Sequence, residues 1–230
     1  KTGELLWQTE ALTSEAHYSS PSVVARDGRQ EVVQLLVDKL VGVDFETGAV
    51  NWEVPWPGRV AVIPSPIVRG DYVYATSGYG AGSMLIRVGP DSQVETIYEN
   101  RVMKHQHGGA ILGGDHVYGY SDGVGWVCQD FLTGERIWRE RDALGKGAIS
   151  YANGRFYCLA EDSGEVVLIE ATIDGWKEQG RFTLSPQTEQ RKEAGKIWTH
   201  PVIADGKLYL RDQELLFAFD TQGDRRAAAK

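Results

Sequence analysis

Hydrophobic residues along this chain occur in short apolar runs, and turns that contain glycine separate the runs. The stretch 110–139 shows the pattern clearly. Its apolar runs at 110–112, 116–120, 125–129 and 135–139 alternate with turns at 113–115, 121–123 and 132–134. Short β-branched and aromatic runs that a turn interrupts every 8–12 residues or so are typical of antiparallel strands. The stretch therefore predicts a unit of four strands.

This unit recurs along the chain. Segments 42–52 and 128–138 share a motif, which we call the repeat phrase, with Asp, Gly and Trp at steps of four residues. Its two full copies contain Asp44, Gly48 and Trp52 and then Asp130, Gly134 and Trp138. The chain opens with the second half of the phrase, which ends at Trp7, and reaches its first half again at Asp220. Trp7 and Trp52 are 45 residues apart, and Trp52 and Trp138 are 86 apart, or two units of 43. In the unit between them, Tyr98 stands where the other copies have tryptophan.

A second set of positions gives a similar period. Apolar pairs or triplets that run into a turn begin at Pro21, Pro66, Ala110, Ile149 and Pro201, at separations of 45, 44, 39 and 52 residues. Repeats of about 40–50 residues made of short strands are typical of propeller blades. The prediction is an all-β fold, a β-propeller of four-stranded antiparallel blades with about five blades in this chain. Segment 187–196 is charged and has no apolar stripe, so we expect a surface loop that lengthens the last unit.

The repeated phrase has a structural explanation. An Asp after a strand accepts hydrogen bonds from backbone N–H groups of the turn, and Gly permits the positive φ that the turn needs. A Trp four residues later, in the outermost strand, can lie over the turn of the neighbouring blade and bury on the order of 200 Å². We therefore interpret the phrase as a docking motif between blades and not as a catalytic one.

The phrase Ala/Gly/Cys-x-Asp-x-x-x-Gly-x-x-x-Trp resembles the tryptophan-docking repeat of the pyrroloquinoline-quinone (PQQ) dehydrogenase-like propellers. That superfamily includes the propeller lipoprotein of the bacterial outer-membrane β-barrel assembly machine. The resemblance covers essentially the whole chain, with two clean copies, half a copy at each end and weaker copies between. The stretch from Phe156 to Phe219 is similar to the C-terminal end of PQQ-like repeat proteins of planctomycete-type bacteria. The resemblance implies one propeller domain over residues 1–230 in a periplasmic or otherwise exported protein.

The number of units leaves two arrangements open. The chain supplies an outer strand at 3–10, four full units, and three strands of a fifth unit that ends near Asp220. Family members usually have seven or eight blades, so the resemblance favours the C-terminal part of a longer propeller. The alternative is a five-bladed ring, closed by residues 3–10 pairing near residues 215–220.

Composition narrows the partners. Lys and Arg number 24 and Asp and Glu 32, which gives a net charge of −8. An acidic chain without a basic patch disfavours nucleic acid and anionic membranes as partners, and we expect no membrane insertion. Cys128 and Cys158 lie on strands of neighbouring units; two buried free thiols are the favoured interpretation, and a disulfide between blades is the alternative.

Candidate binding residues emerge when the units are laid over one another. The reference positions are the starts of the five apolar runs, from Pro21 to Pro201. One residue before them stand Ser20, Ser65, Gly109, Ala148 and His200, and three residues before them stand Tyr18, Ile63, His107, Lys146 and Trp198. Side chains of a strand alternate between two faces, so both sets share a face beside the central channel. We therefore expect His17, His105, His107 and His200 to gather at one end of the channel.

Two interpretations of the histidines remain. They could bind a metal, an anionic ligand or a quinone, and the i, i+2 spacing of His105 and His107 suits two ligands on one strand. They could instead make hydrogen bonds across blades. Because no Asp or Glu stands in the same columns, we predict no metal site. The histidines, Trp198, Lys146 and Arg211 remain candidates for binding a protein or small molecule at the channel mouth, although an ion pair of Arg211 with Asp212 would instead brace a turn.

An enzymatic function would need further residues. Quinone dehydrogenases of this superfamily require a catalytic Asp, a Ca²⁺ held by Glu and Asn, an Arg toward the quinone and, typically, a vicinal cysteine pair. None of these motifs is recognisable, so we assign no catalytic residue and no cofactor. The sequence favours a non-catalytic binding scaffold of the bacterial envelope. The alternative is a PQQ-dependent alcohol or sugar dehydrogenase, with PQQ and Ca²⁺ bound partly by blades outside this chain.

Overall fold

The computed structural model describes residues 2–26 and 28–221, and their strands form five antiparallel sheets. The first sheet contains β1 (Ser22–Arg26), β2 (Arg29–Leu35), β3 (Lys39–Asp44) and β4 (Val50–Pro55). The second contains β5 (Ile67–Arg69), β6 (Tyr72–Ser77), β7 (Gly82–Val88) and β8 (Val94–Asn100). The third contains β9 (Ile111–Gly113), β10 (His116–Ser121), β11 (Gly125–Asp130) and β12 (Arg136–Glu140). The fourth contains β13 (Gly147–Ala152), β14 (Arg155–Ala160), β15 (Glu165–Glu170) and β16 (Glu178–Thr183), and the fifth β17 (Val202–Ala204), β18 (Lys207–Asp212) and β19 (Leu215–Asp220).

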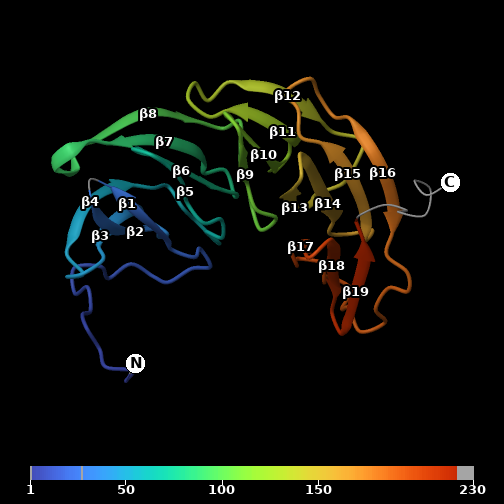
Figure 1. Ribbon diagram of the computed structural model, residues 1–230, viewed down its shortest axis with the longest axis horizontal. Helices are drawn as coiled ribbons and strands as arrows, with labels where there is room; N and C mark the ends of the chain where they lie inside the picture. Colours follow the sequence, from blue (N-terminus) through green and yellow to red (C-terminus); the bar gives the residue numbers. More distant parts are fainter. Residues whose placement is uncertain (1, 27, 222–230) are drawn as a thin grey trace.

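The sheets follow one another around an arc, which confirms the predicted propeller architecture and the number of about five blades (Figure 1). Outer strands β8, β12 and β16 run along the convex side, and β5, β9, β13 and β17 lie toward the concave side (Figure 1). Neighbouring inner strands touch, as β1 does with β5 and β13 with both β9 and β17. The arc is open in Figure 1, where the first and fifth sheets stand at its two ends.

Residues 3–10, which we predicted as an outer strand, contain no strand. A strand needs a partner for its backbone groups, and none of the described strands pairs with this segment. The fifth sheet has the three strands that the sequence indicated and ends at Asp220. Residues 222–223, which would complete the repeat phrase there, lie outside the described residues.

The core is divided into four apolar layers, one between each pair of neighbouring sheets. Trp52, for example, packs with Val73 and Ile86 between the first two sheets. Cys128 and Cys158 are both buried and free, and both belong to the layer between the third and fourth sheets. Within the described residues no helix is long and apolar enough to cross a membrane, and segment 187–196 is irregular, as expected for a loop.

The docking phrase works locally as the sequence indicated. One carboxylate oxygen of Asp130 accepts hydrogen bonds from the backbone N–H groups of Leu132 (3.0 Å) and Thr133 (2.7 Å), and Gly134 follows at φ +73°. Asp44 makes the same two turn bonds before Gly48 at φ +74°. These bonds fix the turn between the third and fourth strands of a blade.

Aromatic side chains from several outer positions meet the next blade. A Cβ at Gly48 would lie 2.5 Å from the Trp7 ring, and one at Gly134 would lie 2.8 Å from the Tyr98 ring. Trp138 donates its indole N–H to the Thr172 carbonyl oxygen at 3.0 Å. Tyr98 thus takes the tryptophan position in the second blade, and Trp7 docks although its segment is not a strand.

The structure also contains a repeated irregularity that the sequence did not reveal. In all four complete blades, the pairing of the third with the fourth strand shifts register at the same place, between 42/43, 85/86, 128/129 and 168/169. In three of them the shift comes just after the residue opposite the docking aromatic: Gly42 faces Trp52, Leu85 faces Tyr98 and Cys128 faces Trp138. A bulge bends its strand and re-aims a side chain, so this shift helps turn the aromatic ring toward the next blade.

Candidate functional site

A hollow lies where the inner strands and the connections between blades meet. Its larger cavity, of about 590 Å³, is lined by Tyr18, Ala61, Ile63, Tyr79, Gln106, His107, Glu161, Ala194, Lys196, Trp198 and His200. A second cavity of about 490 Å³ continues it, and the two share Tyr18, Ile63, His107 and His200. We call the two cavities together the funnel. The volume of the larger cavity lies within the range of about 300–1,000 Å³ that ligand pockets usually have.

Most residues of the two sequence columns line the funnel. These are Tyr18, Ile63, His107 and Trp198 from one column and Ser20, Ser65, Gly109 and His200 from the other. Lys146 and Ala148 are outside the lining. Laying the repeats over one another therefore located this hollow, because equivalent residues of successive blades come together at the same end of the inner strands.

His107 and Glu161 form the most buried polar part of the funnel wall. Their atoms Nε2 and Oε2 are 3.0 Å apart, and the two side chains are only 10% and 11% exposed. The contact has the distance of an ion pair but not the alignment of a hydrogen bond, and neither atom has another hydrogen-bond partner. The Trp198 ring lies 6.1 Å from the His107 ring, centre to centre.

The His200 side chain holds this part of the wall in place by a hydrogen bond to the backbone of His107. Its Nε2 donates to the His107 carbonyl oxygen at 2.6 Å, which joins two segments that are 93 residues apart in the sequence. Gly109 lies under the His200 ring at φ +81°, and a Cβ there would approach that ring to 3.0 Å. Position 109 therefore suits glycine for both its backbone conformation and its close contact.

His105 and His17 do not line the funnel. His105 is 1% exposed, and its Nδ1–H donates to the Tyr120 carbonyl oxygen at 2.8 Å. Burial lowers the pKa of His105 to about 3, so the ring is neutral at ordinary pH. His17 accepts the Val62 backbone N–H at 3.1 Å and holds the N-terminal segment to the connection between the first two blades. The side chains of His105 and His107 thus diverge, and within the described residues no group of three or more His, Cys, Asp and Glu could hold a metal ion.

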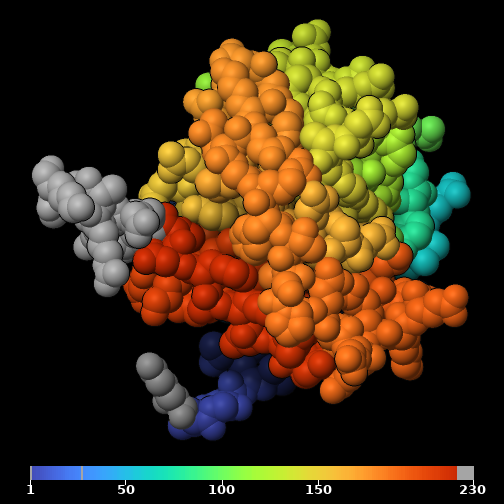
Figure 2. All heavy atoms as spheres, turned by 90° about the vertical axis from the view of Figure 1, so that its right-hand side faces the viewer, coloured from blue at the N-terminus to red at the C-terminus, as the bar shows by residue number. Residues whose placement is uncertain are grey.

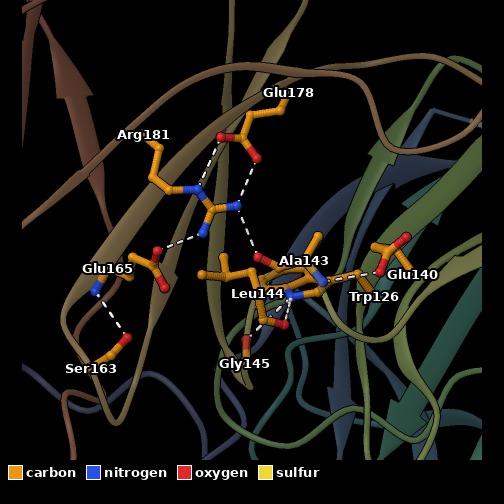
Figure 3. A network of polar contacts seen from close by, with 9 residues as sticks. All are labelled: Trp126, Glu140, Ala143, Leu144, Gly145, Ser163, Glu165, Glu178 and Arg181. Atoms are coloured by element: carbon orange, nitrogen blue, oxygen red, sulfur yellow. Dashed lines mark hydrogen bonds and ion pairs between the residues drawn. The ribbon is translucent and has the colours of Figure 1, made fainter.

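Lys146 lies beside the funnel at the end of a fixed connection. Its ammonium contacts the Gln106 amide oxygen and lies 2.8 Å from an Asp122 carboxylate oxygen. Figure 3 shows how the preceding residues are held: Arg181 donates to the Ala143 carbonyl oxygen (2.9 Å) and Trp126 to that of Leu144 (3.0 Å). The connection from the third to the fourth blade is therefore tied from both sides.

Segment 184–201 forms another wall of the funnel and brings Lys196 and Trp198 to it. Figure 2 shows the segment in orange, projecting beside the red fifth sheet. Asp212, whose side chain is fully buried, accepts the Thr188 backbone N–H (3.1 Å) and pairs with Arg191 (2.5 Å). On the return arm, the Ile197 N–H donates to the Glu161 carbonyl oxygen at 2.8 Å.

The expected pairing of Arg211 with Asp212 is wrong, because Asp212 points into the protein and takes Arg191 as its partner. Arg211 is exposed and donates to the Gln213 carbonyl oxygen at 2.8 Å. With Trp198 and Thr199 it lines a smaller hollow next to the funnel.

Four further residues line the wall without belonging to either sequence column: Tyr79, Gln106, Glu161 and Lys196. Glu161 follows directly after the second strand of its blade, and the equivalent position in the third blade is Asp122. Comparing the turns after the second strands, in addition to the positions before the inner strands, would have shown two carboxylates at this end of the channel. Tyr79 lies in the corresponding turn of the second blade, after β6, whereas Lys196 belongs to the long segment between the fourth and fifth blades, so the repeat gives no signal for Lys196.

The funnel wall is a poor fit for PQQ with Ca²⁺. Ca²⁺ takes six to eight oxygen ligands or so, and Glu161 is the one carboxylate among the residues that line the larger cavity. The quinone carries carboxylates that need cationic partners, whereas Lys196 already contacts Asp162. No chemical step through this cofactor follows from these residues.

Comparison with known proteins places the chain in a family. The family model described as outer membrane protein assembly factor BamB matches residues 1–140. No curated protein matches the chain. The crystal structure of BamB from Moraxella catarrhalis aligns with a TM-score of 0.65 at 18% identity, over 94% of this chain and 63% of that one. The computationally designed protein Ika8 aligns with a TM-score of 0.59 at 14% identity, over 90% of this chain and 60% of that one.

The chain thus spans less than two thirds of either solved protein, and at these identities the likeness shows the fold alone. The family match agrees with the docking phrase and with the five stacked sheets. Because the family model covers more than half of the residues, this chain belongs to the BamB-like family of PQQ-repeat propellers.

Proposed function

We propose that this propeller is a non-catalytic scaffold of the bacterial envelope that binds a partner polypeptide at the mouth of the funnel. The family supports a role of this kind, since its model carries the description of an outer membrane protein assembly factor. The proposal includes a periplasmic or otherwise exported location, and it treats residues 1–230 as one PQQ-like domain. The unbroken series of apolar layers between neighbouring sheets supports the single domain.

The observation that carries the proposal is a group of exposed aromatic side chains around a cavity. Tyr18, Trp198 and Tyr79 are 72%, 58% and 42% exposed, and all three line the larger cavity. Solvent exposure of such large apolar surfaces is unfavourable unless another molecule covers them, and Tyr and Trp are the residues that contribute most at protein interfaces. A rigid platform with a hollow at its centre therefore offers a partner an anchoring point.

Photo-crosslinking in the native bacterium tests this proposal. A benzophenone amino acid is placed at Trp198 or Tyr79, and at Ile137 as the matched control, because Ile137 is also 42% exposed but lies on outer strand β12, away from the funnel. We expect adducts with an outer-membrane assembly protein or its client at positions 198 and 79 and none at 137. The same adducts at all three positions, or none at 198 and 79, would overturn the proposal.

Titration calorimetry separates the scaffold from the dehydrogenase. The purified chain is titrated with PQQ in the presence and absence of Ca²⁺, while light scattering confirms its mass. We expect no calcium-dependent binding, because the funnel wall has too few oxygen ligands for the ion. Saturable binding that requires Ca²⁺ would favour the oxidoreductase instead.

A further inference from the structure

The charged side chains on the funnel wall all have partners within the chain. Lys196 contacts Asp162, and Glu161 lies 3.0 Å from the His107 ring; beside the wall, Lys146 lies 2.8 Å from Asp122. A ligand carboxylate or ammonium would have to displace one of these partners or lose its hydration without compensation. Each charge of the wall therefore already has a polar neighbour in the chain, although the contact between Glu161 and His107 lacks the alignment of a hydrogen bond.

Several neutral polar groups of the larger cavity are also engaged. The Gln106 amide nitrogen donates to the Tyr79 hydroxyl at 2.5 Å, its amide oxygen contacts Lys146, and His200 donates to the His107 carbonyl oxygen. A ligand rich in hydroxyl groups would exchange its hydrogen bonds to water for few new ones, which costs affinity. The larger cavity thus offers few free groups to a sugar chain.

Apolar surface is what the wall leaves free. Trp198 and Tyr18 are more than half exposed, and Ile63 and Ala61 lie in the same lining. The second cavity continues past Ile63 between the inner strands, so the free surface is elongated. An extended chain with apolar side chains matches this shape and this chemistry.

We propose that the funnel binds an uncharged polypeptide segment whose apolar side chains lie against Trp198, Tyr18 and Tyr79, and that it discriminates against charge of both signs. This inference rests on the proposed scaffold function and specifies the partner of the same site. Affinity then comes from burial of apolar area, which salt does not screen. An acidic protein of net charge −8 would otherwise be expected to favour cationic partners.

Calorimetry with matched peptides tests the inference on the full chain. The probes are acetyl-Ser-Phe-Thr-Phe-Ser-amide and two analogues in which both serines become lysine or glutamate, with chitohexaose as the sugar probe. We expect the neutral peptide to bind with an affinity that changes less than about twofold between about 0.05 and 0.5 M NaCl. We expect each charged analogue to bind about tenfold or more weakly, and chitohexaose not to bind.

Variants connect the binding to the funnel. Trp198→Ala should weaken the neutral peptide about tenfold, Trp198→Phe should retain most of the affinity, and Ile137→Ala should leave it unchanged. Trp198 is 58% exposed, so its removal leaves the core intact, and Tyr18→Ala provides a second funnel variant.

Several outcomes would overturn the inference. These are equal or tighter binding of a charged analogue, steep salt dependence, binding of chitohexaose in preference to the peptides, and binding of none of the probes. Crosslinks at position 198 together with any of these results would leave the scaffold function standing and refute only the uncharged partner. Absence of those crosslinks would refute the scaffold function itself.

Discussion

Substitution of Gly134 by alanine separates the cost of a backbone conformation from the cost of losing blade docking. Gly134 and Gly154 both lie in turns at nearly the same φ, +73° and +74°. A Cβ at Gly154 meets nothing within 4 Å, whereas a Cβ at Gly134 would lie 2.5 Å from the Asn100 amide nitrogen and 2.8 Å from the Tyr98 ring. The two alanine variants therefore share the conformational strain and differ in the contact with the second blade.

The structure gives the expected magnitudes. Left-handed backbone costs alanine about 1–2 kcal/mol, and loss of chain freedom in the unfolded state offsets about 0.4–1 kcal/mol of this. Gly154→Ala should thus cost about 1 kcal/mol. In Gly134→Ala, Tyr98 and Asn100 must move away, which strains the bonds from Tyr98 to the Phe131 carbonyl oxygen (3.0 Å) and from Asn100 to that of Gly134 (2.9 Å). At about 1 kcal/mol for each bond, the total becomes about 3 kcal/mol.

Urea unfolding, followed by both circular dichroism and tryptophan fluorescence, measures the two free energies. Coincident transitions are needed, because arrays of repeats can lose cooperativity. A difference of about 2 kcal/mol between the variants would support docking of Tyr98 on Gly134. Equal losses would show that the close approach contributes nothing, and the docking explanation of the repeat phrase would then fail in this blade.

Three further predictions concern other parts of the fold. Trp52 is 5% exposed and Trp138 is half-buried. Trp52→Ala should therefore lower the free energy of unfolding by about 3–5 kcal/mol and Trp138→Ala by about 2 kcal/mol. Equal losses of stability in urea unfolding would contradict this dependence on burial. Asp212→Asn removes the charge that holds segment 184–201, so trypsin should cut this segment about tenfold faster. Asp162→Asn, which removes the exposed ion pair with Lys196, serves as the control. Equal cutting rates in the two variants would refute the role of Asp212. The pKa of His105 is lowered to about 3 in the folded state, against about 6.5 in unfolded chains, so its contribution to stability is complete above about pH 6.5 and is lost at up to about 1.4 kcal/mol per pH unit below it. His105→Asn should therefore be less stable at pH 7 and converge with the parent protein toward pH 3, and parallel acid unfolding curves would contradict the buried neutral histidine.

The architecture could be predicted from the sequence because each blade repeats the same local chemistry. The Asp and Gly of the phrase act within five residues of one another, so their spacing alone indicates the turn. The period between successive tryptophans then gives the number of blades. The substitution of Tyr98 for tryptophan was also recognisable, since a tyrosine ring retains most of the apolar area that docking buries.

Other features depend on contacts that a repeat does not encode. Segment 3–10 has the composition of an outer strand, but a strand needs a neighbour, and composition does not show whether one is present. His105 and His107 look equivalent in the sequence, yet one is buried below Tyr120 and the other faces the funnel. The partner of Asp212 is likewise a matter of the loop's path, because Arg191 lies 21 residues away.

The docking residues and the residues of the funnel wall lie in different parts of a blade, and this separation has a consequence for function. The residues that repeat stand at the turn between the third and fourth strands, where they dock one blade on the next. Much of the funnel wall comes instead from the turns after the second strands and from the connections between blades, as Tyr79, Lys196 and Trp198 do. Sequence change in those segments alters the funnel without touching the docking contacts, so stability and binding can vary independently. Variants of Gly134 should then change unfolding without changing peptide affinity, and variants of Trp198 should do the reverse. If variants at either position changed both the unfolding free energy and the peptide affinity, the blades would share a single coupled core. The four separate apolar layers do not lead us to expect this.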